Sequence, residues 1–376
     1  MAFALRGARV FDGESIHSGL AVVVEGTRVV EVVAVEKIPS SVEMRSVDGG
    51  LLAPGFIDVQ VNGGGGALLN DNPTIDNVRH IAESHRKFGT TGMLPTVITD
   101  APEITAKAIL AVRQARAEKV PGVLGIHIEG PFLDRDRKGA HDAQFIRDMK
   151  EADAALIANA DCGITMLTLA PNRVALDLIA SLARQGVLVS LGHSEASLVE
   201  VTKALAAGAR AFTHLYNAMS QMNGREPGMV GAALADPDSF CGVIADGYHV
   251  HDTALRVALT AKPRNRIMLI TDAMPTAAGG PGNFALQGRA VQRVNGKLVL
   301  DDGTLAGSNL TMDEAVRYCV ERLSVTLEDA LRMASLNPAL FLRRDHDLGR
   351  IKPGYLASLV HLDDDLRVLK TWIEGK

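Results

Sequence analysis

The feature that most constrains the fold is a repeated alternation of strand-like and helix-like segments that fills the middle of the chain. Short apolar runs are separated in most cases by longer segments with an apolar stripe at helical spacing. The strand-like runs cover residues 55–61, 92–98, 123–128, 164–169, 187–191, 209–213, 241–245 and 267–271. The helix-like segments cover residues 75–87, 104–119, 174–184, 198–207 and 253–261. Eight such strands predict a (β/α)8 TIM barrel rather than an open doubly wound sheet.

The two ends of the chain lack this alternation. Residues 2–50 consist of short β-rich runs separated by turn residues and predict a small antiparallel sheet, and residues 357–373 have a similar pattern. Because chain ends often lie close together, we expect a small β-sandwich domain built from residues 1–50 and 345–376. The barrel would then occupy residues 51–344. Two unrelated terminal caps are the alternative.

The last part of the barrel region predicts an insertion. Residues 284–299 have the pattern of a β-hairpin that turns at Asn295-Gly296. Residues 312–323 and 327–335 then have helical spacing, and Asn337-Pro338 is expected to end the second helix. The hairpin would therefore lie between the eighth strand of the barrel and its final helices.

Composition excludes several classes of function. The chain of 376 residues is 47% hydrophobic and 22% charged, which is ordinary for a globular protein with a large core. Aromatic residues make up 4% and the net charge is −5, so no nucleic acid partner is expected. Neither a membrane span nor a signal peptide is indicated, so we expect a cytoplasmic protein without a membrane partner. Cys162, Cys241 and Cys319 are far apart and predict buried thiols.

Histidines follow two consecutive strands of the predicted barrel. The fifth strand is followed by His193 and the sixth by His214, and a helix that Ser194 would cap connects them. Because consecutive parallel strands end at the same rim, we expect the two imidazoles to lie close together. A single histidine there is more often a hydrogen-bonded loop residue, whereas two suggest a metal that still requires a third ligand.

Carboxylates at two other strand ends complete a candidate active site. Glu129 ends the third strand among apolar residues, where an unpaired carboxylate is costly. With His193 and His214 it makes a His₂Glu set with an open position, which is typical of catalytic zinc; a partner arginine is the alternative. Asp272 ends the eighth strand and no obvious helix follows that it could cap. We therefore expect Asp272 to act as general base and acid.

A run of glycines and a pair of histidines on a predicted helix each have more than one interpretation. Residues 63–66 are four consecutive glycines, which fit a flexible connecting loop at least as well as a phosphate-binding loop. His80 and His85 are five residues apart on a predicted helix and therefore do not share a face. We expect both histidines at the surface.

Motifs at the predicted strand ends occur in a specific order along the chain. They are PGFIDVQVNGGGG (54–66), GIHIEGPFL (125–133), GAH (139–141), LGHS (191–194), THLYNAMS (213–220), ADGYHV (245–250), TDAM (271–274), LAGSNLTM (305–312) and LGRIKPG (348–354). In this order the chain resembles the N-acetylglucosamine-6-phosphate deacetylases of the amidohydrolase superfamily over nearly its whole length. Each motif alone has little specificity, whereas the ordered set is highly specific.

The resemblance implies a reaction and a set of site residues. The reaction is hydrolysis of the acetamide of N-acetyl-D-glucosamine 6-phosphate to D-glucosamine 6-phosphate and acetate, in amino-sugar catabolism and cell-wall recycling. The resemblance agrees with Glu129, His193 and His214 as metal ligands and with Asp272 as acid and base. It also implies substrate-binding residues, which are Ala140, His141, Asn217, Ala218, Arg225, Asp246, Gly247, Tyr248, His249, Leu305, Ala306 and Gly307.

Some of these residues have more specific implied roles. His141 would lie near the N-acetyl group, and Asn217 and Ala218 near the phosphate. Arg225 would reach the pocket from a neighbouring subunit, which requires a homodimer or a homotetramer. Its guanidinium suits a phosphate, although a single arginine in a loop is by default a solvated surface residue.

The end of the first strand bears on the number of metal ions. Many members of the superfamily carry His-x-His there and hold two metals, whereas this chain has Gln60-Val61-Asn62. Neutral amides are poor zinc ligands beside imidazole, so we expect one divalent cation per subunit, with zinc as the expected ion. Gln60 and Asn62 would instead contact a water molecule or shape the pocket.

Two other functions stay open at the level of sequence. Another amidohydrolase, such as a deacylase of N-acyl amino acids or a cyclic amidase, would use the same metal centre. Arg225, Asn217 and His249 favour a phosphorylated sugar over those substrates. A catalytically silent barrel that acts as a binding module is the second alternative, and the complete set of ligands and acid argues against it.

Overall fold

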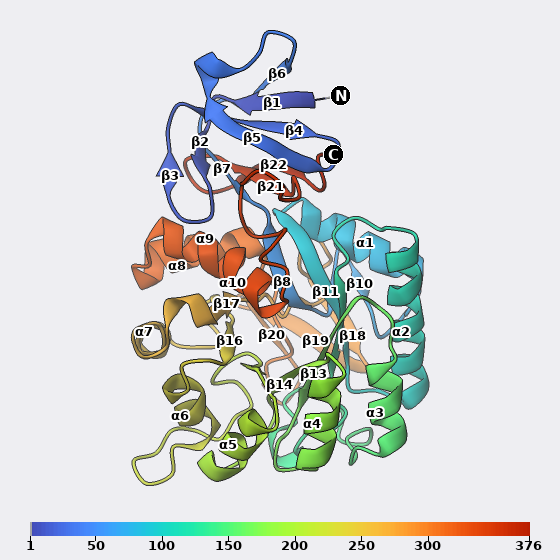
Figure 1. The fold of residues 1–376 in the computed structure, drawn as a ribbon. Coiled ribbons are helices and arrows are strands. Elements are labelled where there is room, and N and C mark those ends of the chain that lie inside the picture. The colour runs from blue at the N-terminus through green and yellow to red at the C-terminus, as the bar shows by residue number, and fades with distance from the viewer. Residues whose placement is uncertain (1) are drawn as a thin grey trace.

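The computed structural model describes residues 2–376, and within them eight parallel strands form a closed barrel (Figure 1). The strands are β8 (Phe56–Val61), β11 (Thr90–Ile98), β12 (Gly125–Glu129), β13 (Ile164–Leu169), β14 (Leu188–Leu191), β15 (Ala211–Phe212), β16 (Phe240–Val243) and β17 (Ile267–Leu269). Each is hydrogen-bonded to the next along the chain. The ring closes where Val61 bridges Ala273, just beyond β17. The predicted (β/α)8 barrel is therefore confirmed.

Helices surround this barrel (Figure 1). They are α1 (Ile75–Arg86), α2 (Pro102–Ala117), α3 (Glu151–Ala158), α4 (Leu176–Arg184), α5 (Leu198–Ala206), α6 (Gly228–Ala235), α7 (Asp252–Ala261), α8 (Met312–Leu323), α9 (Leu327–Ala334) and α10 (Leu336–Phe341). Of these, α3, α6 and α10 are not among the predicted helices. Residues 228–234 of α6 are all buried, so the helix has no polar face that would reveal its period. Pro338 lies in the first turn of α10, where a missing N–H is tolerated, and so does not end the helical region.

Helix α5 begins at Leu198, as the predicted range has it, but its N-cap is not the predicted Ser194. Its N-cap is Ser197, whose hydroxyl accepts a hydrogen bond from Glu200 N while the Glu200 carboxylate accepts one from Ser197 N. This reciprocal pair satisfies two of the N–H groups left open at the start of the helix. Ser194, the expected cap, instead donates its hydroxyl to Asn172 Oδ1 at 2.6 Å. The segment between β14 and α5 is therefore a loop that belongs to the barrel rim.

Strands from both chain ends lie together at one end of the barrel (Figure 1). One sheet has the order β5-β4-β1-β6 and the other the order β22-β21-β7-β2-β3. Both sheets contain a parallel pair, β1 with β6 and β2 with β7, so the prediction of a purely antiparallel sheet is wrong. Buried side chains from both ends, including Phe3, Leu5, Leu359 and Trp372, share one apolar cluster. The strands are β1 (Ala2–Arg6), β2 (Arg9–Phe11), β3 (Ile16–His17), β4 (Leu20–Glu25), β5 (Arg28–Ala34), β6 (Glu43–Ser46), β7 (Leu51–Pro54), β21 (Leu359–Leu362) and β22 (Val368–Trp372).

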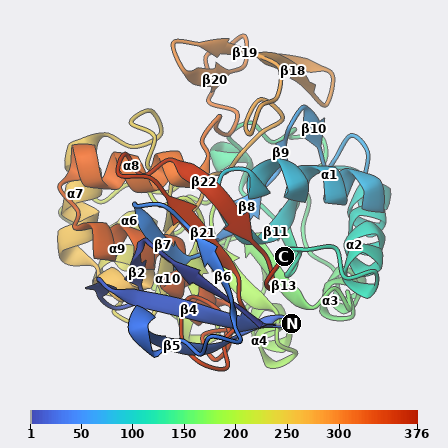
Figure 2. The ribbon, with the colours of Figure 1, turned by 90° about the horizontal axis from the view of Figure 1, so that it is seen from above.

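The predicted hairpin insertion has three strands, β18 (Asn283–Leu286), β19 (Arg289–Val294) and β20 (Lys297–Val299). The turn at Asn295-Gly296 lies where it was predicted, with positive φ at both residues, and an unpredicted turn at Gln287-Gly288 adds the third strand. Figure 2 shows this sheet standing out from the barrel. Its buried apolar side chains belong to one cluster with Ile98 and Met274 of the barrel rim. The insertion therefore backs one wall of the barrel mouth.

Asp58 is a fully buried carboxylate within β8. Its Oδ2 accepts a hydrogen bond from Thr271 Oγ1 at 2.5 Å, and its Oδ1 accepts one from Gln60 N at 3.1 Å. Burial raises the pKa of Asp58 to about 7, although these hydrogen bonds oppose the shift. The carboxyl thus ties β8 to the end of β17 inside the barrel.

This environment predicts a pH-dependent stability. Because the pKa of Asp58 rises from 3.8 to about 7 on folding, the native state binds the extra proton, and the free energy of unfolding falls as pH rises through this interval. Asp58→Asn keeps the shape of the side chain and removes this dependence. We expect the variant to be more stable than the parent by a few kcal/mol at about pH 8 and by less at about pH 5. Urea unfolding at the two pH values measures the difference; an equal difference at both would contradict the prediction.

Other predictions from composition concern the cysteines and the membrane. Cys162, Cys241 and Cys319 are free and buried, as predicted. Burial raises the pKa of Cys241 and of Cys319 to about 12, so these two thiols stay protonated at neutral pH. Within residues 2–376, no helix has the length and the hydropathy that crossing a membrane requires.

Candidate metal centre and active site

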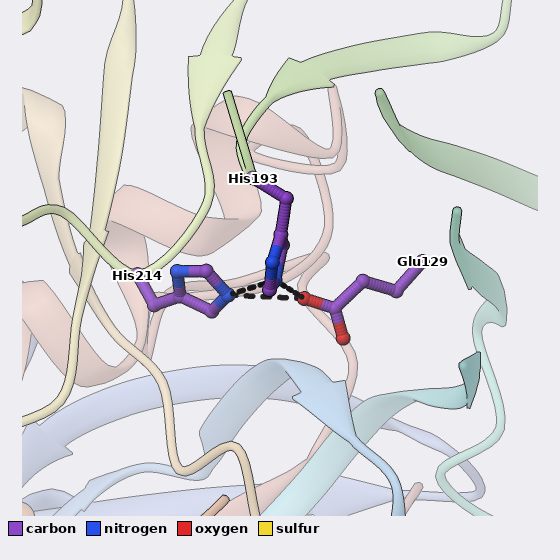
Figure 3. Close-up of side chains that lie close together, drawn as sticks. All are labelled: Glu129, His193 and His214. Carbon is purple, nitrogen blue, oxygen red and sulfur yellow. Dashed lines mark hydrogen bonds and ion pairs between the residues drawn. The ribbon is translucent and has the colours of Figure 1, made fainter. Parts of the chain in front are cut away.

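Three predicted metal ligands converge at the C-terminal rim of the barrel (Figure 3). Glu129 is the last residue of β12, and His193 and His214 follow β14 and β15 by two residues. Glu129 Oε1 lies 3.0 Å from His214 Nε2 and 3.3 Å from His193 Nε2, and the two Nε2 atoms are 3.0 Å apart. All three side chains are buried. The strand order therefore brings together residues that are far apart in the sequence, because neighbouring parallel strands end at one rim.

The donor set of this cluster fits a divalent cation. His193 Nδ1 donates a hydrogen bond to the Arg137 carbonyl at 2.8 Å, so in the neutral ring Nε2 carries a lone pair toward the centre of the cluster. Burial opposes ionisation of Glu129, yet its contacts with the imidazoles of His193 and His214 hold the pKa of this carboxyl well below its usual value. Two imidazole nitrogens and a carboxylate oxygen directed at one point are a ligand set that could hold a metal ion.

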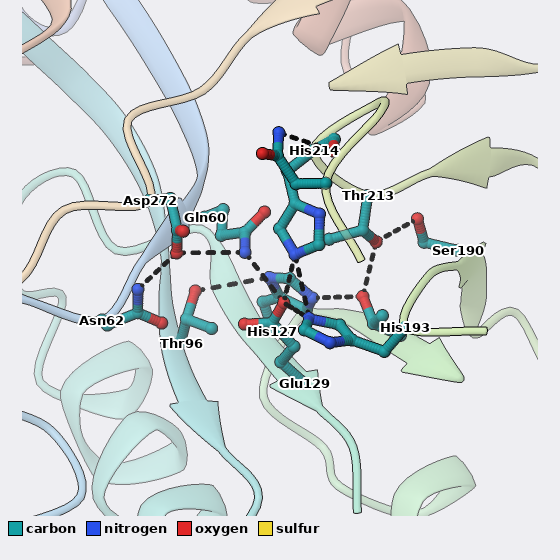
Figure 4. A network of polar contacts seen from close by, with 12 residues as sticks. Gln60, Asn62, Thr96, His127, Glu129, Ser190, His193, Thr213, His214 and Asp272 are labelled. Atoms are coloured by element: carbon teal, nitrogen blue, oxygen red, sulfur yellow. Dashed lines mark hydrogen bonds and ion pairs between the residues drawn. The ribbon is translucent and has the colours of Figure 1, made fainter. Parts of the chain in front are cut away.

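The side-chain amide of Gln60 lies between the carboxylates of Asp272 and Glu129 (Figure 4). Gln60 Nε2 donates to Glu129 Oε1 at 3.0 Å and to Asp272 Oδ1 at 3.2 Å, and Asn62 Nδ2 donates to the same Asp272 oxygen at 2.6 Å. Burial and the nearby negative charge of Glu129 raise the pKa of Asp272 to about 6. The carboxylate therefore lies beside the candidate metal centre with a pKa suited to proton transfer near neutral pH.

A network of polar side chains fills the barrel interior beneath the cluster (Figure 4). His127 Nε2 contacts Thr168 Oγ1 at 2.8 Å, and Thr213 Oγ1 lies 2.7 Å from both Thr168 Oγ1 and Ser190 Oγ. Burial lowers the pKa of His127 to about 4, so its ring is neutral. These contacts join four consecutive strands, β12 to β15, just below Glu129, His193 and His214. The network therefore holds the strand ends in register.

A cavity of about 320 Å³ opens beside the cluster. Many of the residues that the sequence suggested for the site line it, namely Asn62, Glu129, Ala140, His141, His193, His214, Asn217, Ala218, His249, Asp272, Leu305 and Gly307. Burial, with the neighbouring His193, lowers the pKa of His141 to about 3, and the two rings meet edge to face at 4.5 Å between centroids. A cavity of this size with few convergent polar groups is typical of a small-molecule site.

Several residues of the predicted site lie outside the lining of this cavity. Arg225 is exposed in the loop before α6, and Ala306 is fully buried in the apolar cluster of the insertion. Gly247 lies against Tyr318, and Tyr248 lies over Gly296 of the insertion. Gln60 contacts both carboxylates from the barrel interior, and Asp246 contacts His249, as described below.

The cavity also has lining residues that were not predicted. They are Ile98, Asp136, Arg137, Gly139, Ile244, Met274 and Thr304. Ile98 pairs with Glu129 in the register of β11 and β12, so its place could have been read from the strand ends. The positions of Arg137 and Thr304 depend on loop paths, for which the sequence contains no periodic signal.

The glycine run and the two histidines of α1 form one packed unit. The N–H groups of Gly63, Gly65 and Gly66 donate to backbone carbonyls of residues 273–277 at 2.8–2.9 Å, so the run is neither a phosphate cradle nor a free linker. His85 is fully buried and donates Nε2–H to Gly63 O at 2.9 Å, so the prediction that it lies at the surface is wrong. His80 is exposed, as predicted. A side chain at Gly64 would meet His85 Nε2 at 2.5 Å, which explains the need for glycine there.

Asp246 orients His249 at the edge of the cavity. His249 Nδ1 donates to Asp246 Oδ2 at 2.7 Å, and the other carboxylate oxygen accepts the N–H groups of Tyr248 and His249. The contact assigns Nδ1 of His249 to the carboxylate, which leaves Nε2 as the ring nitrogen available to the cavity.

This arrangement predicts a binding defect for Asp246→Asn. The variant removes the charge of the hydrogen-bond acceptor, so we expect KM for the substrate to rise roughly tenfold and kcat to change much less. Steady-state kinetics measure both parameters, with Asp238→Asn, at an exposed acid in the loop between α6 and β16, as the control. An unchanged KM would contradict a role for the Asp246–His249 pair in substrate binding.

A (β/α)8 barrel with histidines and a carboxylate converging at the strand ends, and a second carboxylate beside them, is the arrangement of a metal-dependent hydrolase. Comparison with known families agrees with this class. Residues 51–376 match the Amidohydrolase family, and residues 2–52 match the NagA composite domain. The chain therefore belongs to the amidohydrolase family.

Individual relatives are similar over most of their length. The N-acetylgalactosamine-6-phosphate deacetylase of Shewanella sp. (strain ANA-3) is 45% identical over 327 residues, which cover 87% of this chain and 83% of the relative. The N-acetylgalactosamine-6-phosphate deacetylase of Escherichia coli O157:H7 is 41% identical over 351 residues, 92% of each chain. The crystal structure of N-acetylglucosamine-6-phosphate deacetylase from Pasteurella multocida superposes with a TM-score of 0.97 at 33% identity, covering 100% of this chain and 99% of that one.

Proposed function

We propose that this protein hydrolyses the acetamide of N-acetyl-D-glucosamine 6-phosphate to D-glucosamine 6-phosphate and acetate. The observation that carries the proposal is the convergence of Glu129, His193 and His214 beside Asp272, at a cavity of about 320 Å³. The near-complete superposition on the Pasteurella multocida deacetylase supports the same substrate. The reaction would serve amino-sugar catabolism and cell-wall recycling in the cytoplasm.

One divalent cation, expected to be zinc, is assigned to the three ligands. When bound, it would polarise the acetamide carbonyl and lower the pKa of a water molecule at its open position. Gln60 and Asn62 direct amide N–H groups at the carboxylates of Glu129 and Asp272, so the groups that they present to these carboxylates are hydrogen-bond donors and not metal ligands. The donor set therefore supports one cation per subunit.

Asp272 and His141 supply the proton transfers and the polar contact of the reaction. Asp272 accepts a proton from the attacking water as the new C–O bond forms at the acetamide carbon. The same carboxyl then donates that proton to the amide nitrogen as the C–N bond breaks, which releases acetate and the free amine. His141 is neutral at neutral pH and donates a hydrogen bond to the carbonyl oxygen as negative charge develops on it.

The remaining residues bind the sugar phosphate. Asn217, Ala218 and His249 line the cavity and would hold the phosphate end of the substrate. Arg225 is exposed on a loop outside the cavity of its own chain, which suits the proposal that it serves the pocket of a neighbouring subunit in a homodimer or homotetramer. Its guanidinium would add the positive charge that a phosphate requires.

The chain is proposed to contain two domains. Residues 51–344 would form the catalytic barrel, and residues 1–50 with 345–376 would form a small β domain. The sheet that pairs β7 with β21 and the apolar cluster shared by both chain ends support this division.

A second candidate substrate is N-acetyl-D-galactosamine 6-phosphate. The two relatives that bear that activity in their names are 45% and 41% identical to this chain, above the 33% of the Pasteurella multocida deacetylase. The two substrates differ only in the configuration at one hydroxyl-bearing carbon, and the same metal centre would hydrolyse either.

Acetate release from three substrates tests the proposal. N-Acetylglucosamine 6-phosphate is expected to be hydrolysed with a kcat/KM well above that of N-acetylgalactosamine 6-phosphate, and unphosphorylated N-acetylglucosamine is expected to react far more slowly because it lacks the charged group. A chelator should abolish the activity and added zinc should restore it. Preference for the galacto substrate would favour the second candidate, and hydrolysis of neither phosphorylated sugar by the zinc-loaded protein would refute both.

A further inference from the structure

Residues 134–141, here called the clasp segment, hold the candidate ligand His193 from two sides. The backbone N–H of Asp134 donates to the His193 carbonyl at 2.9 Å, and His193 Nδ1 donates to the Arg137 carbonyl at 2.8 Å. The segment continues to His141, whose ring contacts that of His193. Both the backbone and the ring of the ligand therefore depend on the position of one loop.

His193 needs such support because its backbone is strained. Its φ is 49°, in the left-handed region that residues other than glycine rarely adopt. Such a conformation is energetically unfavourable and persists only where the surrounding contacts determine it. The contacts around it are the hydrogen bond from Asp134 N to the His193 carbonyl and, at the adjacent residues, those from Gly192 N to Leu169 O and from Ser194 N to Ala218 O.

The side chain of Asp134 extends this support to the residues after His193. It is 8% exposed, and its Oδ2 accepts hydrogen bonds from Asn172 Nδ2 at 2.5 Å and from Glu195 N at 3.4 Å. Asn172 in turn accepts the hydroxyl of Ser194 at 2.6 Å. Residues 193–195 are thus joined to Asp134 through the backbone, through a direct side-chain contact and through Asn172.

A separate ion pair connects the clasp segment to the same loop. The Arg137 guanidinium forms an ion pair with Glu195. Arg137, whose carbonyl accepts the hydrogen bond from His193, is therefore also linked to the loop that follows His193. This pair is partly exposed and contributes less than the buried contacts of Asp134.

We propose that Asp134 is a positioning residue for cation binding, which fixes the backbone and the ring of His193 so that Nε2 points at the shared centre. This inference rests on the proposed metal centre and adds a residue that neither contacts the ion nor lines the cavity. Partners that orient a metal ligand in this way typically change metal affinity by about 10–100-fold when they are lost.

Zinc affinity of Asp134→Asn tests the inference. The substituted amide would direct an NH₂ group at Asn172 Nδ2 or at the N–H of Asp136, both of which donate to Asp134 in the parent. We expect the zinc dissociation constant, measured by competition with a chromogenic chelator, to rise by about 10–100-fold. Asp364→Asn removes one exposed negative charge in the sheet region at the other end of the barrel and should leave the affinity unchanged.

A reciprocal exchange separates positioning from general destabilisation. In the double variant Asp134→Asn with Asn172→Asp, residue 134 donates to residue 172 instead, and the hydroxyl of Ser194 keeps an acceptor. We expect this variant to recover most of the lost zinc affinity. Recovery supports the inference, whereas a failure to recover contradicts it. If Asp134→Asn does not fold, Asn172→Ala, at a more exposed side chain, should show the same loss of affinity.

The outcomes distinguish this inference from the proposed function. Wild-type zinc affinity in Asp134→Asn or in Asn172→Ala would overturn the role of Asp134 and leave the metal centre intact. An unmutated protein that binds no zinc would overturn the metal centre itself, and with it this inference. Thermal unfolding of the zinc-free variants adds a check, because a purely structural role would lower the unfolding temperature without changing the affinity of the folded protein.

Discussion

Asp272→Asn is expected to lower kcat for acetate release by about 10²–10⁴-fold while the protein keeps its bound cation. The asparagine side chain has the shape of aspartate and retains an oxygen that can accept the hydrogen bonds from Gln60 and Asn62. What it loses is the ability, assigned to Asp272 in the proposed mechanism, to take a proton from water and to return it to the amide nitrogen. KM should change little, because the substrate contacts are intact.

Two measurements on this variant separate the roles. Metal analysis should find the same zinc content as in the parent, and steady-state kinetics should find the loss in kcat. Near-normal kcat would remove Asp272 from the mechanism. Loss of zinc would instead show that the carboxylate of Asp272 helps to hold the cation.

His193→Ala is expected to lose both the cation and the activity. The variant removes one of the three proposed ligands, and the remaining pair, Glu129 and His214, would leave the cation with an incomplete set. Because a bound cation contributes several kcal/mol to stabilisation of the transition state, we expect activity to fall by more than about 10²-fold. Metal analysis after dialysis and acetate release at saturating substrate measure the two effects.

His361→Ala is a matched control for His193→Ala. Both histidines are 5% exposed, but His361 lies in β21 and donates to the Gly49 carbonyl, far from the barrel rim. The control should lose some stability and keep both zinc and activity. Equal loss of zinc in the two variants would mean that unfolding, not ligand removal, explains the result for His193.

The barrel could be predicted from sequence because its strands and helices have different apolar periods. Helices with one apolar face, such as α1 and α8, were predicted nearly to the residue. Helix α6 was not, because it is buried on all sides and its apolar residues have no period. The parallel pairs among the terminal strands were also not predictable, since pairing between distant segments leaves no local signal.

The convergence of the site followed from one topological rule. Residues at the ends of parallel strands meet at one rim, so Glu129, His193, His214 and Asp272 could be grouped before their distances were known. Loop residues had no such rule. Arg137 and Asp134 contact His193 only because of the path of the loop after β12, and the burial of His85 depends on how the glycine run packs against α1.

The sequence by itself determined the class of fold, the rim at which the chemistry lies and the residue types available there, because periodicity and strand order are properties of the chain. The tertiary structure decided the hydrogen bonds that orient each ligand, the backbone strain at His193 and the contacts of Gln60 and Asn62 with the two carboxylates. These depend on distances between segments that are remote in the sequence. Such distances are set by packing of the whole molecule and not by any local preference.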